Sequence, residues 1–214
     1  MHTSTHANDR LLLAAAHRGD TAEIRAALDA GANVESRDGE HRTPLLLAAR
    51  ADHVAAAEIL VDAGADPDAR DAQDDTPWLV TGVTGSVDMM RVLLAAGPDL
   101  RLTNRFGGTS LIPAAERGHV AYVRAVLRET DIDVDHVNRL GWTALLEAVI
   151  LGDGGLPHME IVELLITAGA DPLLADHDGT TPLQHARRHG FDRIAGLLEA
   201  ASARAGSRGR ETSR

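Results

Sequence analysis

Few residues of this sequence have the types and the spacing that chemistry requires. His185 and His189 stand four positions apart, which would place both on one face of a helix as possible zinc ligands. Two arginines between them, Arg187 and Arg188, bring positive charge that opposes cation binding, and the glutamate of a zinc hydrolase motif is missing. Structural or solvent-exposed histidines are the favoured interpretation, and the sequence predicts no metal site.

A carboxylate within an apolar run is the second candidate. Glu147 lies between Leu146 and Ala148, and a carboxylate in such surroundings must find partners or shift its pKa. An insertion at residues 152–157 contains three glycines, and long loops of this kind often carry function. The candidate partners of Glu147 are Arg117, Trp142 and His158.

Two interpretations of this region stay open. In the first, a polar pocket binds a small ligand or performs catalysis, and its residues are Glu116, Glu147, Asp153 and His158, with Arg117 beside them. In the second, the same side chains form a hydrogen-bonded bracket that holds the inserted loop closed.

The composition excludes several classes of function. The chain has 214 residues and no cysteine, so disulfides, thiolate zinc sites and a cysteine nucleophile are absent. It has no lysine, which removes P-loop and Schiff-base chemistry. A net charge of -11 disfavours general binding to nucleic acid or to anionic membranes. The sequence therefore predicts neither an enzyme nor a cofactor.

An internal repeat predicts the elements that position these residues. A three-residue segment that begins with threonine occurs five times, as Thr43-Pro44-Leu45, Thr76-Pro77-Trp78, Thr109-Ser110-Leu111, Thr143-Ala144-Leu145 and Thr181-Pro182-Leu183. The steps between successive threonines are 33, 33, 34 and 38 residues. Threonine can cap a helix through its hydroxyl, and proline fits the first helical position. Apolar pairs such as Ile59-Leu60 follow, and then turn signals such as Gly64-Ala65-Asp66. Each unit is thus predicted to begin a helix at the threonine.

These spacings and residues resemble the ankyrin repeat, whose units of about 33 residues consist of a β-turn finger and two antiparallel helices. Residues 107–127 and 138–166 look like single-domain bacterial ankyrin proteins in particular. The resemblance implies an all-α solenoid of about six helix-turn-helix repeats. The sequence departs from the family pattern because the histidine of Thr-Pro-Leu-His is replaced in every copy.

The repeat predicts one domain at residues 10–201, with units at about 10–42, 43–75, 76–108, 109–142, 143–180 and 181–201. Residues 1–9 are short and polar, so a flexible N-terminus is expected. Residues 202–214 are rich in Ser, Gly and Arg, which is typical of a disordered tail. The sequence shows neither a signal-peptide pattern nor a membrane-spanning segment, so a cytoplasmic protein is expected.

The resemblance also implies where a partner binds, because the family generally uses the concave groove lined by fingers and inner helices. The apolar and arginine residues expected there gather in repeats four and five: Arg105, Phe106, Arg117, Arg139, Leu140 and Trp142. Tryptophan and arginine are enriched in binding hot spots. The alternatives are that Trp142 covers a neighbouring hairpin and that the arginines pair internally.

The leading hypothesis is a non-enzymatic module that binds a partner protein with an acidic segment, as a monomer rather than an oligomer. A ligand or catalytic pocket around Glu147 is the alternative.

Overall fold

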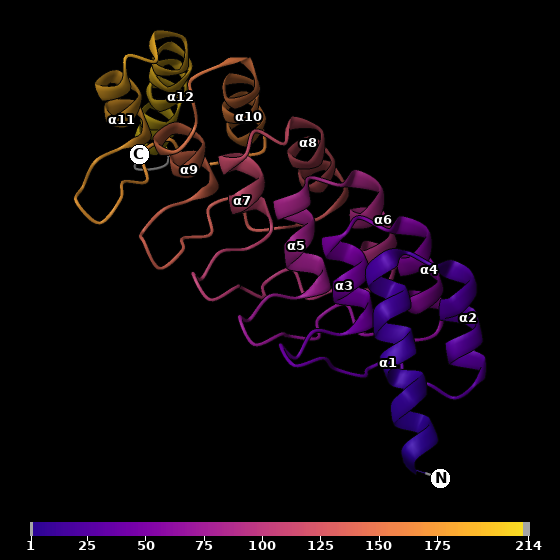
Figure 1. Cartoon of the computed structure of the whole chain (residues 1–214). Helices are drawn as coiled ribbons and strands as arrows, with labels where there is room; N and C mark the ends of the chain where they lie inside the picture. Colours follow the sequence, from indigo (N-terminus) through magenta and orange to yellow (C-terminus); the bar gives the residue numbers. More distant parts are fainter. Residues whose placement is uncertain (1, 212–214) are drawn as a thin grey trace. The chain divides into compact units, whose positions relative to one another are not determined.

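The computed structural model describes residues 2–211, and these form twelve helices and no strand. The helices form six antiparallel pairs (Figure 1). Their bounds are α1 His2–Arg18, α2 Thr21–Asp29, α3 Pro44–Arg50, α4 Val54–Asp62, α5 Pro77–Thr84, α6 Val87–Ala95, α7 Leu111–Glu116, α8 Val120–Glu129, α9 Ala144–Ile150, α10 Leu156–Thr167, α11 Pro182–His189 and α12 Asp192–Glu211. The predicted all-helical class of helix-turn-helix repeats is confirmed.

The chain divides into two compact units, Met1–Arg105 and Phe106–Arg214. In the first unit the inner helices α1, α3 and α5 pack in a row, and the outer helices α2, α4 and α6 pack behind them (Figure 1). The second unit repeats this arrangement with α7, α9 and α11 inside and α8, α10 and α12 outside. Each unit therefore contains three complete helix pairs.

Threonine caps begin most of the inner helices, as the repeat predicts. The hydroxyl oxygens of Thr43, Thr76, Thr143 and Thr181 each accept the backbone N–H three residues further on. The exception is α7, which begins one residue later, and its N-cap Ser110 makes no side-chain cap bond. The hydroxyls of Thr109 and Ser110 are buried without a partner.

Small side chains let the inner helices approach closely. Ala48, Ala49, Ala114, Ala115 and Ala148 are completely buried, which matches the scarcity of aromatic residues in the sequence. Inner and outer helices both contribute large apolar residues to each core, such as Trp78 of α5 and Tyr122 of α8. Close packing of this kind fixes each inner helix, and thereby the loop that precedes it.

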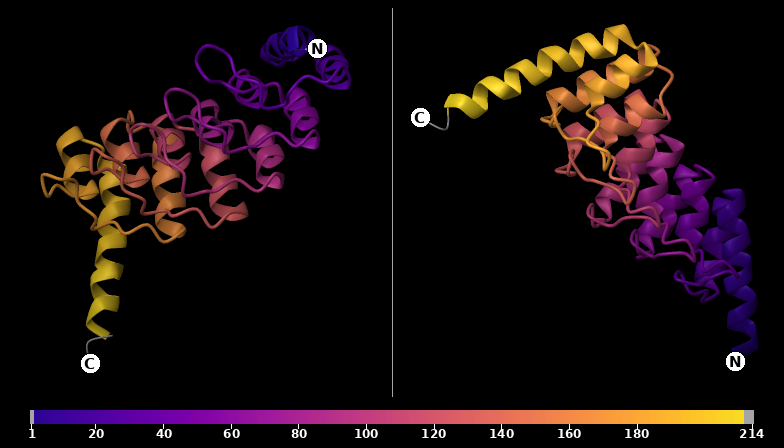
Figure 2. Two further views of the ribbon diagram at one scale, coloured as in Figure 1. Left: turned by 90° about the horizontal axis from the view of Figure 1, so that it is seen from below. Right: turned by 90° about the vertical axis from the view of Figure 1, so that its left-hand side faces the viewer.

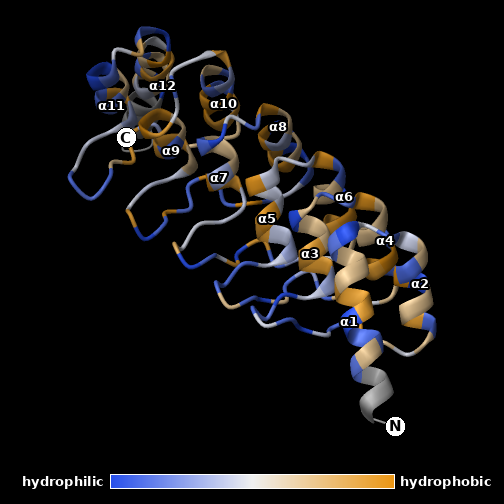
Figure 3. Cartoon of the chain, in the orientation of Figure 1, coloured by the Kyte–Doolittle hydropathy of each residue, from blue (hydrophilic) through white to orange (hydrophobic). Residues whose placement is uncertain are grey.

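Four of the finger loops that precede inner helices are each built around one Asx residue. The side-chain oxygens of Asp38, Asp71, Asn138 and Asp176 each accept the backbone N–H groups two and four residues further on. Hydrophilic residues gather along the fingers, whereas apolar residues gather on the helices (Figure 3). The fingers are therefore ordered polar loops rather than mobile connections.

Both ends of the chain differ from the prediction. Helix α1 already begins at His2, and the backbone N–H of Asn33 donates to Asp9 while the side chain of Asn8 donates to Ala30. These bonds tie the polar segment to the turn after α2, so it belongs to the first repeat. At the other end α12 continues to Glu211, beyond the end of α11 (Figure 2). Met1 lies outside the described residues, and so do residues 212–214 of the predicted C-terminal tail.

Within residues 2–211, no helix has both the length and the apolar character needed to cross a membrane.

Candidate functional site

The predicted site residues fall in both units, but nine of the ten lie in the second, Phe106–Arg214. Arg105 ends the first unit, where its guanidinium donates to the side-chain oxygen of Gln73.

Two neighbouring fingers of the second unit bring Phe106, Arg139 and Leu140 together, and we call these three residues the finger surface. The backbone N–H of Arg139 donates to the carbonyl of Phe106 at 2.9 Å. A Cβ at Gly107 would lie 2.9 Å from Cγ of Arg139, so the arginine stem rests on this glycine. Phe106 and Leu140 are each 53% exposed. Adjacent fingers thus present two large apolar side chains to solvent.

Two other predicted members are not part of the finger surface. Trp142 is partly buried rather than exposed, and its backbone N–H and carbonyl are both bonded to Asn138. Arg117 is exposed but forms the C-cap of α7, at the opposite end of that helix from its finger. The structure therefore brings Phe106, Arg139 and Leu140 together, and it does not place Trp142 or Arg117 among exposed finger residues.

Glu147 on α9 is buried, and its partner is Asn138, which the sequence analysis did not single out. The Nδ2 of Asn138 donates to Oε1 of Glu147 at 2.8 Å. Burial and, to a lesser extent, the nearby charge of Glu116 raise the pKa of Glu147 to about 7, against the opposing effect of the Asn138 hydrogen bond. A carboxyl with this pKa changes its charge near neutral pH.

The next finger contains a corresponding hydrogen bond, in which the finger residue accepts and the helix residue donates. Asp176 precedes His185 by nine residues, as Asn138 precedes Glu147, and Nε2 of His185 lies 2.7 Å from Oδ2 of Asp176. Hydrogen bonds from the Thr180 backbone and from His185 lower the pKa of Asp176. The shared nine-residue spacing is the sequence signal that identifies Asn138 as the partner of Glu147.

The inserted loop is held closed by Asp153 and His158. The Nδ1 of His158 lies 2.8 Å from Oδ1 of Asp153, and its Nε2 lies 2.9 Å from the backbone carbonyl of Glu116. Oδ1 of Asp153 also accepts the N–H of Gly155 at 2.8 Å, and these bonds from Gly155 and His158 lower the pKa of Asp153. Two of the four side chains predicted for a bracket, Asp153 and His158, therefore hold the loop, whereas Glu116 contributes its backbone carbonyl and Glu147 bonds to Asn138.

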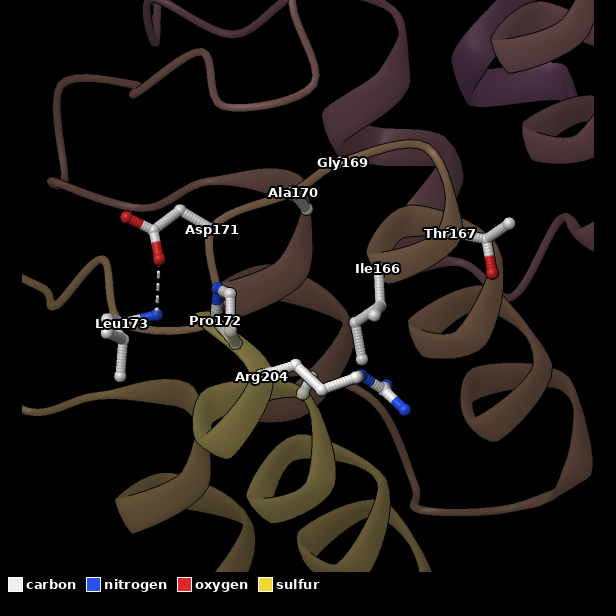
Figure 4. A pocket seen from close by; sticks show the side chains of 9 residues that line it. Ile166, Thr167, Gly169, Ala170, Asp171, Pro172, Leu173 and Arg204 are labelled. Carbon is white, nitrogen blue, oxygen red and sulfur yellow. Dashed lines mark hydrogen bonds between the residues drawn. The ribbon is translucent and has the colours of Figure 1, made fainter. Parts of the chain in front are cut away.

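Near the C-terminal end of α10 lies a cavity of about 520 Å³, lined by the turn at residues 169–173 and by Ala201 and Arg204 of α12 (Figure 4). One oxygen of Asp171 accepts the N–H of Leu173 inside the turn. In the described part of the chain, no group of three or more His, Asp or Glu side chains is arranged to hold a metal ion.

Comparisons with known proteins agree with this architecture. A family model described as ankyrin repeats, in three copies, matches residues 2–71 and 79–175. A curated relative, the putative ankyrin repeat protein YahD of Escherichia coli strain K12, is 50% identical over 104 residues. That match covers 49% of this chain and 52% of the relative, so the chain spans about half the length of YahD.

Solved structures match over most of the chain. The ankyrin repeat domain ABAYE2397 of Acinetobacter baumannii AYE has a TM-score of 0.85 at 48% identity, and the match covers 89% of this chain and 96% of that one. The ankyrin repeat protein EF0377 has a TM-score of 0.85 at 36% identity, and the match covers 89% of this chain and 97% of that one. This chain belongs to the ankyrin repeat family.

Proposed function

We propose that this protein is a non-enzymatic, monomeric binding protein of the cytoplasm that holds a partner protein through its finger surface. Ankyrin repeats are generally protein–protein interaction modules. The observation that carries the proposal is the exposure of Phe106 and Leu140 on adjacent, hydrogen-bonded fingers. Large apolar side chains that stand together in solvent mark interaction sites.

The mechanism is recognition by a preformed surface. Asn138 holds the finger backbone through two accepted hydrogen bonds, so binding costs little conformational entropy. Phe106 and Leu140 supply apolar anchors, while Arg139 beside them offers a planar guanidinium to a partner carboxylate.

The test is affinity capture from a lysate of the native cell. Wild type is compared with the double variant Phe106→Ser/Leu140→Ser. The matched control is Leu156→Ser/Leu173→Ser, which removes two other exposed leucines from the same unit. We expect a protein that wild type and control retain and that the finger variant loses. Equal retention by all three proteins would show that the finger surface is not the binding site.

A ligand or catalytic pocket at Glu116, Glu147, Asp153 and His158 is the second candidate, favoured by the raised pKa of Glu147. Its test is a small-molecule thermal-shift screen. A ligand that raises the melting temperature of wild type, and does not raise that of Glu147→Gln, would support the pocket.

A further inference from the structure

A cavity of about 550 Å³ lies in the first unit between α1, the finger at residues 37–42 and α3. Helix α1 lines the cavity with Arg10, Leu13, Ala14 and His17. Their spacing of three, four and seven positions places them on one face of the helix. Arg37 and Arg42 line the finger side, and the buried Leu47 of α3 completes the apolar part.

The charges in this cavity are not balanced. Arg42 is neutralised, because its guanidinium lies 2.7 Å from Asp38 and 3.2 Å from Glu40. Arg37 donates instead to two backbone carbonyls, those of His41 at 3.0 Å and Arg70 at 2.6 Å.

The side chain of Arg10 has neither a hydrogen bond nor an ion pair with any described residue, and Arg37 has no carboxylate partner among them. Two arginines thus have no carboxylate partner, and with Arg42, Asp38 and Glu40 the cavity and its edge carry a net positive charge, although the whole protein carries a net charge of -11.

We propose that this cavity binds an extended acidic segment of a partner protein, with an aliphatic side chain between its carboxylates. Carboxylates complement Arg10 and the fixed guanidinium of Arg37, and the apolar stretch formed by Leu13 and Leu47 accommodates an aliphatic residue. The cavity at α10 and α12 differs, because a single arginine and one aspartate are the charged groups that line it.

The inference rests on the proposed binding function and adds the chemistry of the partner. It concerns the first unit alone, whereas the finger surface belongs to the second. The two can therefore fail separately.

The test measures binding of a fluorescent peptide of alternating glutamate and leucine to the full chain by fluorescence anisotropy. The control peptide has glutamine in place of every glutamate. We expect saturable binding of the acidic peptide that weakens as salt is added. For Arg10→Glu we expect binding to weaken by roughly tenfold or more. Arg10 is suited to substitution because it makes no contact on which the fold depends.

Arg25→Glu is the matched control, because Arg25 is exposed on α2 and does not line the cavity, and the charge change is the same. Binding that Arg25→Glu and Phe106→Ser/Leu140→Ser both retain, and that Arg10→Glu loses, would support the inference. The inference is overturned if the acidic peptide does not bind, if the glutamine peptide binds equally well, or if both arginine variants lose binding equally. It is also overturned if an oligonucleotide probe binds more tightly than the peptide. If partner capture fails while the peptide still binds in this way, only the finger-surface proposal fails.

Discussion

The pair Asn138–Glu147 departs most clearly from the rest of the molecule at the scale of single residues. In three other fingers the residue that organises the loop is an aspartate, and it pairs with Arg42, Arg50 or His185. Here an asparagine donates to a carboxyl that is 5% exposed. The finger that carries Leu140 is therefore held by a group whose charge depends on pH.

Glu147 should make stability depend on pH near neutrality. Its pKa is about 7 in the folded protein against an ordinary value of 4.5, so between these values the folded state holds a proton that the unfolded state has released. The stabilisation by protonated Glu147 is therefore complete below a pH of 4.5 and is lost as the pH rises through about 7. We expect Glu147→Gln to be more stable than wild type by about 1–3 kcal/mol near pH 8, and similar to it near pH 5.

Denaturant unfolding at the two pH values measures this difference. The control is Glu116→Gln, which removes the neighbouring like charge and should weaken the pH dependence without abolishing it. An unchanged pH dependence in Glu147→Gln would contradict the assignment.

The comparison between the two fingers supplies a second prediction. Asn138→Asp removes the donor and places a carboxylate against Glu147, so we expect a loss of about 2–4 kcal/mol in the free energy of unfolding. Adding Glu147→His recreates the pair seen in Asp176–His185, and we expect it to restore part of the loss. Thermal and denaturant melts of wild type and of the two variants decide this, and a double variant no more stable than Asn138→Asp would refute the equivalence.

At the scale of elements, the insertion between α9 and α10 is closed by packing as well as by hydrogen bonds. A Cβ at Gly152 would lie 2.6 Å from the ring of His158 and even closer to the carbonyl oxygen of Ala148. The loop can therefore hold His158 against Glu116 only if this position has no side chain.

Gly152→Ala should open the bracket. We expect a loss of about 1–3 kcal/mol of unfolding free energy, since neither the ring nor the carbonyl has room to move, with faster amide exchange at residues 152–156. Gly196→Ala is the matched control, because Gly196 lies within α12 with no atom near the added Cβ. That variant should gain about 0.5–1 kcal/mol. Equal effects of the two substitutions would show that the close approach has no role.

Much of the element scale could be predicted from sequence, because caps and turns depend on local residues. The threonines at 43, 76, 143 and 181 begin their helices as expected. The ends of α1 and α12 could not be predicted from composition, since polar residues remain helical where neighbouring turns or the helix itself bond to them.

The candidate site was predictable only in part. Exposure of Phe106 and Leu140 follows from the register of the repeat, whereas the partial burial of Trp142 depends on how its finger folds back onto Asn138. The cavity at Arg10 depends on helix α1 continuing its inner face beside the first finger, and a degenerate first repeat gives little sign of this.

At the scale of the whole molecule, stability should be the sum of the repeats and of the contacts between neighbours. The pair α1/α2 packs on one neighbouring pair, α3/α4, and α11/α12 packs on α9/α10 alone. Each of the pairs α3/α4 and α9/α10 packs on two other helix pairs, the one before it and the one after it in the sequence. Helices that lack one neighbour bury less apolar surface and should open at lower free energy.

Native-state amide exchange tests this order. We expect α1, α2, α11 and α12 to exchange at lower denaturant than α3, α4, α9 and α10, because only the former open without disrupting two interfaces. A core substitution such as Leu60→Ala in α4 should cost about 2–5 kcal/mol and speed exchange in α2 and α6, the outer helices that contact α4. Earliest exchange in α9 and α10 would contradict the nearest-neighbour account. It would also place the mobile part of the molecule at Glu147 and the inserted loop, where the bonds described above predict rigidity.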